Sequence, residues 1–239
     1  MSLFISCLLS LSAQDIVKGV ENLQRGTTSQ GTYYMEVIRP DYRTSYTMRF
    51  WDDRAHDRSL VVIVESSTGK DDGSVFLKKN NNLWMFLPKA GKNMRMPPSM
   101  MLDPWMGSDL TNDDLVKESS ISKDYNATIV SQKGDEYLLE LQPKPDAPVV
   151  WGKVLLSVKM PGYIPVKAEY YDEDGVLVRS LVYSDVKLMG GRRMPTKMEV
   201  IPKDKPGHKT VLRVKSVEFD VRISDDHFDV NQMQRWSDL

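Results

Sequence analysis

Most of this chain of 239 residues consists of short stretches in which apolar and polar residues alternate. On one of them Tyr46, Met48 and Phe50 share a face. A period of two residues is typical of β-strands, because successive side chains of a strand point to opposite faces. Similar stretches lie at 33–38, 75–77, 83–87, 127–131, 137–141, 150–158, 166–170, 177–183, 194–200 and 211–219, and a continuous apolar run lies at 60–64. The pattern predicts about a dozen strands, with residues 60–64 buried on both faces.

The connections between these stretches predict how the strands pair. Many are tight and carry turn residues, as in Asn80-Asn81-Asn82, Gly134-Asp135 and Asp174-Gly175. Parallel sheets need helical crossovers of about a dozen residues, which we do not find, so an antiparallel meander is expected. A sheet of so many strands cannot remain flat, because strands twist. We therefore expect it to coil into a barrel or an open half-barrel.

Helical spacing is clear in only two places. Residues 15–24 carry apolar side chains at helical intervals, with Asp15 as the candidate N-cap, and a second helix is expected after Thr111. Two helices are too few to cover the outside of a large sheet, but they can close its open side. We predict a mainly β fold with small helical insertions: one domain over residues 14–239, an open half-barrel of antiparallel strands closed by a lid around an internal space.

The stretch from Asn93 to Leu115 breaks the strand pattern. It carries Met94, Met96, Met100, Met101, Trp105 and Met106, together with Pro97, Pro98 and Pro104. Proline removes a backbone donor and fixes φ, so this stretch should form a loop or short turns and not a regular strand or helix. Methionine adapts to apolar surfaces of variable shape. We interpret residues 93–120 as a mobile lid over a hydrophobic cavity; the alternative is a loop whose methionines fill the protein's own core.

Acidic residues gather where the lid is expected to become helical. Thr111 and Asp114 have the spacing of a capping box, which predicts a helix start. Asp103, Asp109 and Asp113 lie beside them, but carboxylates are expected near a helix N-terminus because of its dipole. Their spacing is not that of a calcium-binding loop. We therefore predict a structural role for this group.

Residues 1–13 are unlike the rest of the chain. Leu3 to Leu11 form an apolar run of signal-peptide length that ends in Ser12 and Ala13. We predict the remnant of a secretory signal peptide; the alternatives are a lipoprotein anchor at Cys7 and a short buried helix. Because Cys7 is the only cysteine, an internal disulfide and a cysteine-based zinc site are excluded. An exported protein without disulfides favours a bacterial periplasm.

Charge and motifs exclude several classes of function. The formal net charge of −1 argues against a phosphate-binding surface, which needs a basic excess. His56, His208 and His227 show no metal-ligand spacing. We find no G-x-S-x-G motif, no Ser/His/Asp constellation and no glycine-rich phosphate loop. We therefore expect no enzymatic activity, no cofactor, no metal and no nucleic-acid partner.

Four segments, in order, carry a resemblance to a known family. They are residues 73–96, residues 103–115 (DPWMGSDLTNDDL), residues 162–200 and residues 225–233 (DDHFDVNQM), the last with Met233 where leucine is more usual. Together they resemble the outer-membrane lipoprotein-sorting protein family of the LolA-like superfamily, which has LppX-type and RseB-type relatives. The similarity spans essentially all of the chain after Ala13.

The resemblance implies a half-barrel with a helical lid that carries lipids or the acyl chains of lipoproteins through the periplasm of a Gram-negative bacterium. It also implies an inner-membrane transporter that loads the carrier and an outer-membrane acceptor. We expect transient contacts with these membrane proteins and a monomeric carrier. The alternative is an RseB-like sensor of envelope stress, or another protein-interaction module on the same scaffold.

A carrier of this kind needs an apolar wall and a lid, and two groups of residues fit those roles. One group comes from a single strand and the other from the proposed lid. The candidate ligand-binding residues are Tyr46, Met48, Phe50, Met94, Met96, Met100, Met101, Trp105 and Met106. For the strand residues, plain packing in the core is an equally good explanation.

Overall fold

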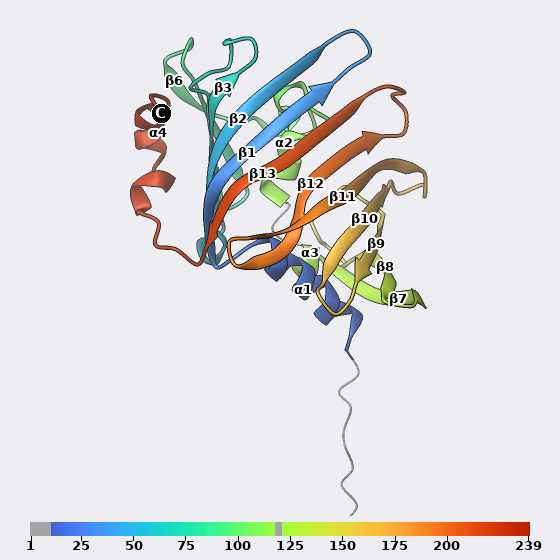
Figure 1. Ribbon diagram of the computed structural model, residues 1–239. Helices are drawn as coiled ribbons and strands as arrows, with labels where there is room; N and C mark the ends of the chain where they lie inside the picture. The colour runs from blue at the N-terminus through green and yellow to red at the C-terminus, as the bar shows by residue number, and fades with distance from the viewer. Residues whose placement is uncertain (1–10, 118–120) are drawn as a thin grey trace, which may run out of the picture.

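In the computed structural model, which describes residues 11–117 and 121–239, one antiparallel sheet of 13 strands dominates the molecule (Figure 1). The strands are β1 Thr28–Ile38, β2 Arg43–Asp53, β3 Arg58–Ser66, β4 Val75–Lys79, β5 Asn82–Leu87, β6 Lys92–Arg95, β7 Tyr125–Lys133, β8 Glu136–Pro143, β9 Lys153–Lys159, β10 Ile164–Tyr171, β11 Leu177–Met189, β12 Arg192–Pro202 and β13 Lys209–Phe219. The sheet is coiled but not closed, so the predicted mainly β, open half-barrel is confirmed.

The strand order joins two meanders at the centre of the sheet. It runs β6-β5-β4-β3-β2-β1-β13-β12-β11-β10-β9-β8-β7, so every neighbouring pair is consecutive in the chain except β1 and β13. Ser29 pairs with Phe219 and Ile38 with Lys209 across this junction. The two halves of the chain therefore share one concave face, and β6 and β7 form the free edges.

Helix α1 (Ala13–Gln24) lies across the open side of the sheet and begins earlier than we predicted. Ser12, and not Asp15, is the N-cap: its hydroxyl accepts a bond from the Asp15 backbone N–H at 3.1 Å. The Asp15 carboxylate in turn accepts from the Ser12 backbone N–H at 3.3 Å, which completes a capping box. Residues 1–10 of the predicted signal remnant lie outside the described residues, whereas Ser12 and Ala13 form the start of α1.

The proposed lid is mostly irregular, as expected, but its first residues are not. Lys92–Arg95 form the edge strand β6, in which Met94 pairs with Met85. The prediction that no strand lies here was wrong, because the prolines begin only at Pro97. Short 3-10 helices follow at η2 (Pro98–Met100) and η3 (Trp105–Gly107).

The lid then carries the short helix α2 (Asn112–Lys117), and a further short helix, α3 (Ile121–Asp124), follows it. The predicted capping box of α2 is confirmed: Asp114 N–H donates to the Thr111 hydroxyl at 3.2 Å, and Thr111 N–H donates to the Asp114 carboxylate at 2.7 Å. Residues 118–120 of the proposed lid fall outside the described part of the chain.

A C-terminal segment covers the convex face over β2–β5, which sequence reasoning did not predict. It comprises η5 (Asp225–Phe228), η6 (Val230–Gln232) and α4 (Met233–Trp236). Phe228 and Met233 are buried against Leu60 and Val62, while Ile63 faces the concave side. The prediction that residues 60–64 are buried on both faces is therefore confirmed, and the expectation of only two helices was wrong.

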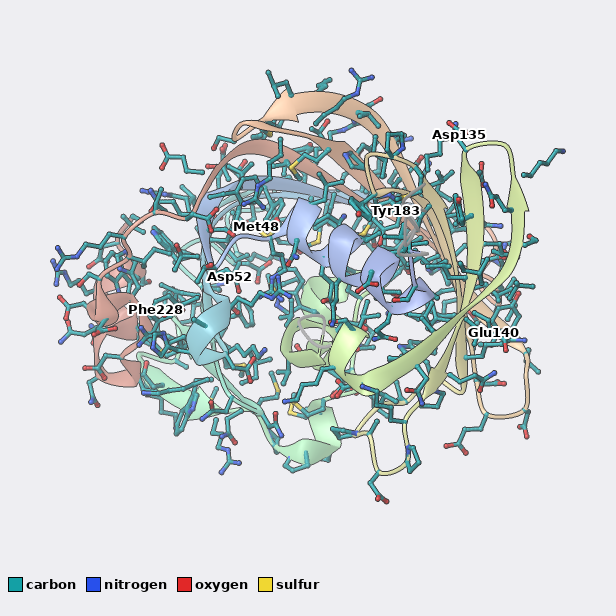
Figure 2. The ribbon with its side chains drawn as sticks, turned by 90° about the horizontal axis from the view of Figure 1, so that it is seen from below. Met48, Asp52, Asp135, Glu140, Tyr183 and Phe228 are labelled. Carbon is teal, nitrogen blue, oxygen red and sulfur yellow. The ribbon has the colours of Figure 1, made fainter. Side chains whose placement is uncertain are left out.

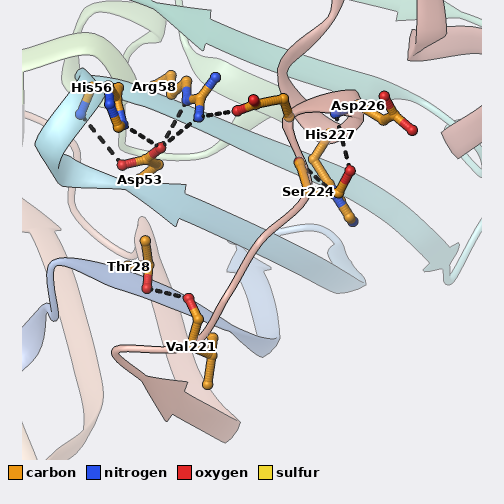
Figure 3. A network of polar contacts seen from close by, with 9 residues as sticks. Thr28, Asp53, His56, Arg58, Val221, Ser224, Asp226 and His227 are labelled. Carbon is orange, nitrogen blue, oxygen red and sulfur yellow. Dashed lines mark hydrogen bonds and ion pairs between the residues drawn. The ribbon is translucent and has the colours of Figure 1, made fainter.

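Arg58 ties this C-terminal segment to the sheet (Figure 3). Its guanidinium donates to Asp53 at 2.9 Å and to Asp225 at 2.5 Å, so one cation joins the end of β2 to η5. Thr28 at the start of β1 donates to the Val221 carbonyl at 2.5 Å.

Among the described residues, no helix is long and apolar enough to cross a membrane.

Candidate cavity and lid

A cavity of about 320 Å³ lies between the concave face of the sheet, α1 and the lid. Figure 2 shows α1 across the open side, with Met48 and Tyr183 on the two halves of the sheet, and both residues line the cavity. Apolar side chains from α1, from both halves of the sheet and from the lid make most of its wall. They include Val17, Phe50, Trp105, Leu156, Ala168 and Leu181.

The lid is held to the sheet by a buried ion pair at the tip of the β1–β2 hairpin. Arg39 and Asp109 lie 3.1 Å apart, and their side chains are only 8% and 5% exposed. Arg39 also donates to the Gly107 carbonyl at 2.5 Å, and the Thr210 hydroxyl donates to Asp109 at 2.7 Å. These bonds join the turn after η3 to both β1 and β13.

A second ion pair lies on the cavity wall itself. Arg179 on β11 donates two bonds to Asp114 on α2, at 2.7 and 2.6 Å. The guanidinium carbon of Arg179 lies 4.6 Å from the centre of the Trp151 ring and 4.9 Å from that of Tyr170, within the range of cation–π contacts. Burial alone would raise the pKa of the Asp114 carboxyl, but the bonds and charge of Arg179 hold that pKa below its ordinary value.

Tyr46 makes a third connection to the lid. Its hydroxyl donates to the Met106 carbonyl at 3.2 Å, and its side chain is otherwise buried in the core. Burial, reinforced by the charge of Asp71, raises the pKa of Tyr46 to about 12, so the hydroxyl keeps its proton at neutral pH. The three connections lie on β2, β11 and the β1–β2 hairpin, so the closed lid depends on both halves of the sheet.

A protein-family model with the description "Uncharacterized protein" matches residues 55–235, which is well over half of the chain. The fold is shared with a LolA superfamily protein from Nitrosomonas europaea, at a TM-score of 0.75 and 24% identity over 92% of this chain and 98% of that one. The chain belongs to this family, and its fold is that of the LolA superfamily.

Two further solved structures share the LolA superfamily fold of this chain. A DUF1329 family protein from Desulfovibrio piger matches with a TM-score of 0.81 at 21% identity, over 92% of this chain and 97% of that one. A putative outer membrane lipoprotein-sorting protein domain from Vibrio parahaemolyticus matches with a TM-score of 0.79 at 20% identity, over 93% and 98%. A comparison with curated proteins found no match.

Within this LolA-type half-barrel, three of the nine candidate residues lie on the cavity wall: Met48, Phe50 and Trp105. Another four pack in the neighbouring core beneath the lid without lining the cavity: Tyr46, Met96, Met101 and Met106. The remaining two lie farther out, Met94 half-buried on β6 and Met100 exposed by 40%. Of the nine candidates, two strand residues and the lid residue Trp105 therefore line the cavity, whereas the lid methionines do not.

Sequence reasoning missed the half of the LolA-type wall that comes from β9–β12. Leu156, Ala168 and Leu181 lie on alternating positions of predicted strands, but nothing in the sequence said which face would be concave. Arg179 and Asp114 also escaped notice as partners, because 65 residues separate them. Among the described residues, no group of three or more histidine, cysteine, aspartate or glutamate side chains is placed to hold a metal ion.

Proposed function

We propose that this protein is a periplasmic carrier that holds the acyl chains of a lipid or lipoprotein in the cavity and transfers them toward the outer membrane. The observation that carries the proposal is a largely apolar cavity beneath a lid that three polar connections hold in place. A LolA-like fold suggests a carrier-type role and is typical of envelope proteins. Holding and releasing an acyl chain needs no reacting group, and the proposal assigns no catalysis.

The affinity would come from burial of methylene groups. Each buried methylene contributes about 0.8 kcal/mol, so ten of them supply about 8 kcal/mol before the cost of ordering the ligand is subtracted. A cavity of about 320 Å³ lies at the lower end of the range for small-molecule sites. A diacyl cargo would therefore require the lid or α1 to move outward.

Loading and unloading would be done by membrane partners. An inner-membrane transporter would open the lid to insert the acyl chains, and an outer-membrane acceptor would remove them. The Arg179–Asp114 pair is well placed to respond, since it joins the lid to the wall that the ligand would touch. The inner-membrane transporter, the outer-membrane acceptor and the periplasmic location are all part of the proposal.

Native mass spectrometry, with organic extraction, of protein recovered from the periplasm tests the proposal. We expect a bound diacyl or triacyl species whose mass identifies its class. Protein that is recovered free of lipid should take up phospholipid or a lipopeptide when challenged. A clean ligand-free mass that persists after both challenges would contradict the carrier function and would favour an interaction module.

A cavity-filling substitution makes this test specific to the cavity. Ala168 is 2% exposed and lines the wall, so Ala168→Phe should occupy space needed by the ligand and lower the bound lipid at least tenfold. The matched control is Ala55→Phe, an exposed position in η1 (Arg54–His56) that should leave lipid uptake unchanged. Equal uptake by both variants would place the lipid elsewhere on the protein.

A further inference from the structure

The strands at one margin of the sheet are basic and carry no acidic residues. From Val75 to Leu102 the chain carries Lys78, Lys79, Lys89, Lys92 and Arg95, and it carries no aspartate or glutamate, although the whole chain has a net charge of −1. This run contains β4, β5 and the edge strand β6 (Figure 1). Lys78 is buried and paired with Asp57, whereas the other four basic side chains are exposed.

The same margin continues directly into an exposed apolar loop. After β6, the loop 97–104 exposes Pro97, Pro98, Met100, Leu102 and Pro104 to solvent. Leu102 is 62% exposed and Met100 is 40% exposed, which is unusual for apolar side chains so close together in the chain. Asp103 is the only charged residue of this loop.

The loop is presented on a firm base. Met96 and Trp105, which flank it, are buried at 6% and 3% exposure. The Asn112 side chain donates to the Met100 carbonyl at 2.9 Å, and Asn112 N–H donates to the Asp103 carbonyl at 3.1 Å. With the lid closed, the exposed side chains thus point outward from a loop whose base, Trp105, lines the cavity.

The acidic residues Asp225, Asp226 and Asp229 of the C-terminal segment each have partners of their own, and Asp225 bonds to Arg58. Val230 of this segment contacts β6, since its carbonyl accepts from the Asn93 side chain at 2.6 Å. Asp229 accepts from the backbone N–H of Asn231 at 2.9 Å, and Asp226 lies 4.0 Å from Arg235. None of the ion pairs found among the described residues involves Lys79, Lys89, Lys92 or Arg95.

We propose that this margin, the basic edge at Lys89, Lys92 and Arg95 together with the apolar loop 97–104, docks the protein onto an anionic phospholipid membrane. The exposed lysines and arginine complement the negative charge of the headgroups, and each basic group near such a surface contributes favourably. The apolar loop supplies side chains that enter the interface between headgroups and acyl chains. An acidic protein partner would explain the exposed basic residues, but it would not explain why Met100 and Leu102 are exposed beside them.

Co-sedimentation with vesicles tests this docking. We expect the protein to bind vesicles of phosphatidylcholine mixed with phosphatidylglycerol, to bind phosphatidylcholine vesicles much more weakly, and to dissociate as salt is raised. Lys89→Glu/Lys92→Glu/Arg95→Glu and, separately, Met100→Ser/Leu102→Ser should each weaken binding more than about tenfold. Absence of binding to the anionic vesicles, or binding that neither variant reduces, would overturn the proposal.

Matched controls separate docking from general loss of charge or apolar surface. Leu188→Ser removes a side chain that is 77% exposed near the end of β11, and Lys133→Glu/Lys159→Glu/Lys187→Glu reverses three exposed lysines elsewhere. Both control variants should bind as the unaltered protein does, and equal losses in them would overturn the assignment to this margin. Ala168→Phe should keep vesicle binding while losing lipid uptake, so failure of docking and failure of the carrier function give different results.

Discussion

At the scale of single residues, we expect the Arg179–Asp114 pair to matter for stability. Its bidentate bonds lie in a largely desolvated wall between α2 and β11. Replacing Asp114 by asparagine would remove the carboxylate that makes two bonds to the buried Arg179 guanidinium, and breaking a buried ion pair typically costs about 3 kcal/mol or more. We expect Asp114→Asn to lower the free energy of unfolding, measured with urea, by about 3 kcal/mol, whereas the exposed Asp135→Asn should change it by less than about 0.5 kcal/mol.

The pH dependence of that effect follows from the lowered pKa of Asp114. A carboxyl whose pKa is lower in the folded protein contributes stability that is present above its unfolded pKa of about 3.9 and is lost as pH falls through the folded value. The stability difference between the unaltered protein and Asp114→Asn should therefore be constant near neutral pH and shrink below about pH 4. A difference that stays constant in acid would show that the carboxylate charge does not matter.

His227, in the C-terminal segment, also has a lowered pKa, but here the folded protein disfavours the charged form of the side chain. Its ring stacks on Trp236 at 4.1 Å and lies 4.9 Å from Trp51, and burial lowers its pKa below the ordinary value. Arg49 and Arg235 reinforce this shift, while Asp226 and the Ser224 carbonyl oppose it. Stability linked to His227 is thus present above its unfolded pKa of about 6.5 and is lost as pH falls through the lower, folded value.

We therefore expect His227→Phe, which keeps an aromatic ring in the stack, to be less destabilised than the unaltered protein when the pH is lowered from about 7 to about 5. Urea unfolding at the two pH values measures this. His208→Phe, on the β12–β13 connection, is the matched control and should follow the unaltered protein. The same loss of stability in His227→Phe would rule out this histidine as its source.

At the scale of elements, the N-terminal cap decides how firmly α1 covers the cavity. Because Ser12 and Asp15 form a reciprocal capping box, Ser12→Ala should lower the free energy of unfolding by about 1 kcal/mol. Urea unfolding measures this loss, and Ser131→Ala on the exposed face of β7 serves as the control. An unchanged midpoint in Ser12→Ala would mean that the end of α1 is already frayed.

The elements also show what local sequence can and cannot predict. Thr111 and Asp114 identified the start of α2 because both partners of the cap lie within one turn. The strand Lys92–Arg95 could not be predicted from the sequence, since its four residues are too few to show a clear alternation of apolar and polar side chains beside a proline-rich loop. The packing of the C-terminal segment on the sheet was also not predicted. Its contact with Leu60 and Val62 forms between residues far apart in the sequence, which local periodicity does not reveal.

At the scale of the whole molecule, the sequence predicted the half-barrel but not the extent of its cavity wall. Alternation assigns Ala168 to one face of β10 and Leu181 to one face of β11, but only the coiling of the complete sheet turns those faces toward Met48 and Trp105. Long-range pairing of β1 with β13 brings the two halves together, and it joins residues up to 190 positions apart, Ser29 and Phe219. The cavity is therefore formed by the whole coiled sheet with its lid and α1, and not by any one segment.

That arrangement makes lid opening the step that should limit transfer of cargo. The lid is fastened through Arg39–Asp109, Arg179–Asp114 and Tyr46–Met106, so weakening one connection should raise the population of open molecules. In the ligand-free protein we expect hydrogen exchange at residues 94–106 to be faster than in β1 and β13, and to slow when lipid is bound. Exchange as slow as in those central strands would contradict a mobile lid.

The same variants link this motion to function. Asp114→Asn should increase the rate at which preloaded fluorescent lipid moves to acceptor vesicles, and Asp135→Asn should leave that rate unchanged. Because the substitution removes contacts of the closed state and leaves the apolar wall intact, exchange at residues 94–106 should accelerate in parallel with transfer. Faster exchange without faster transfer would show that cargo leaves by another route, such as displacement of α1.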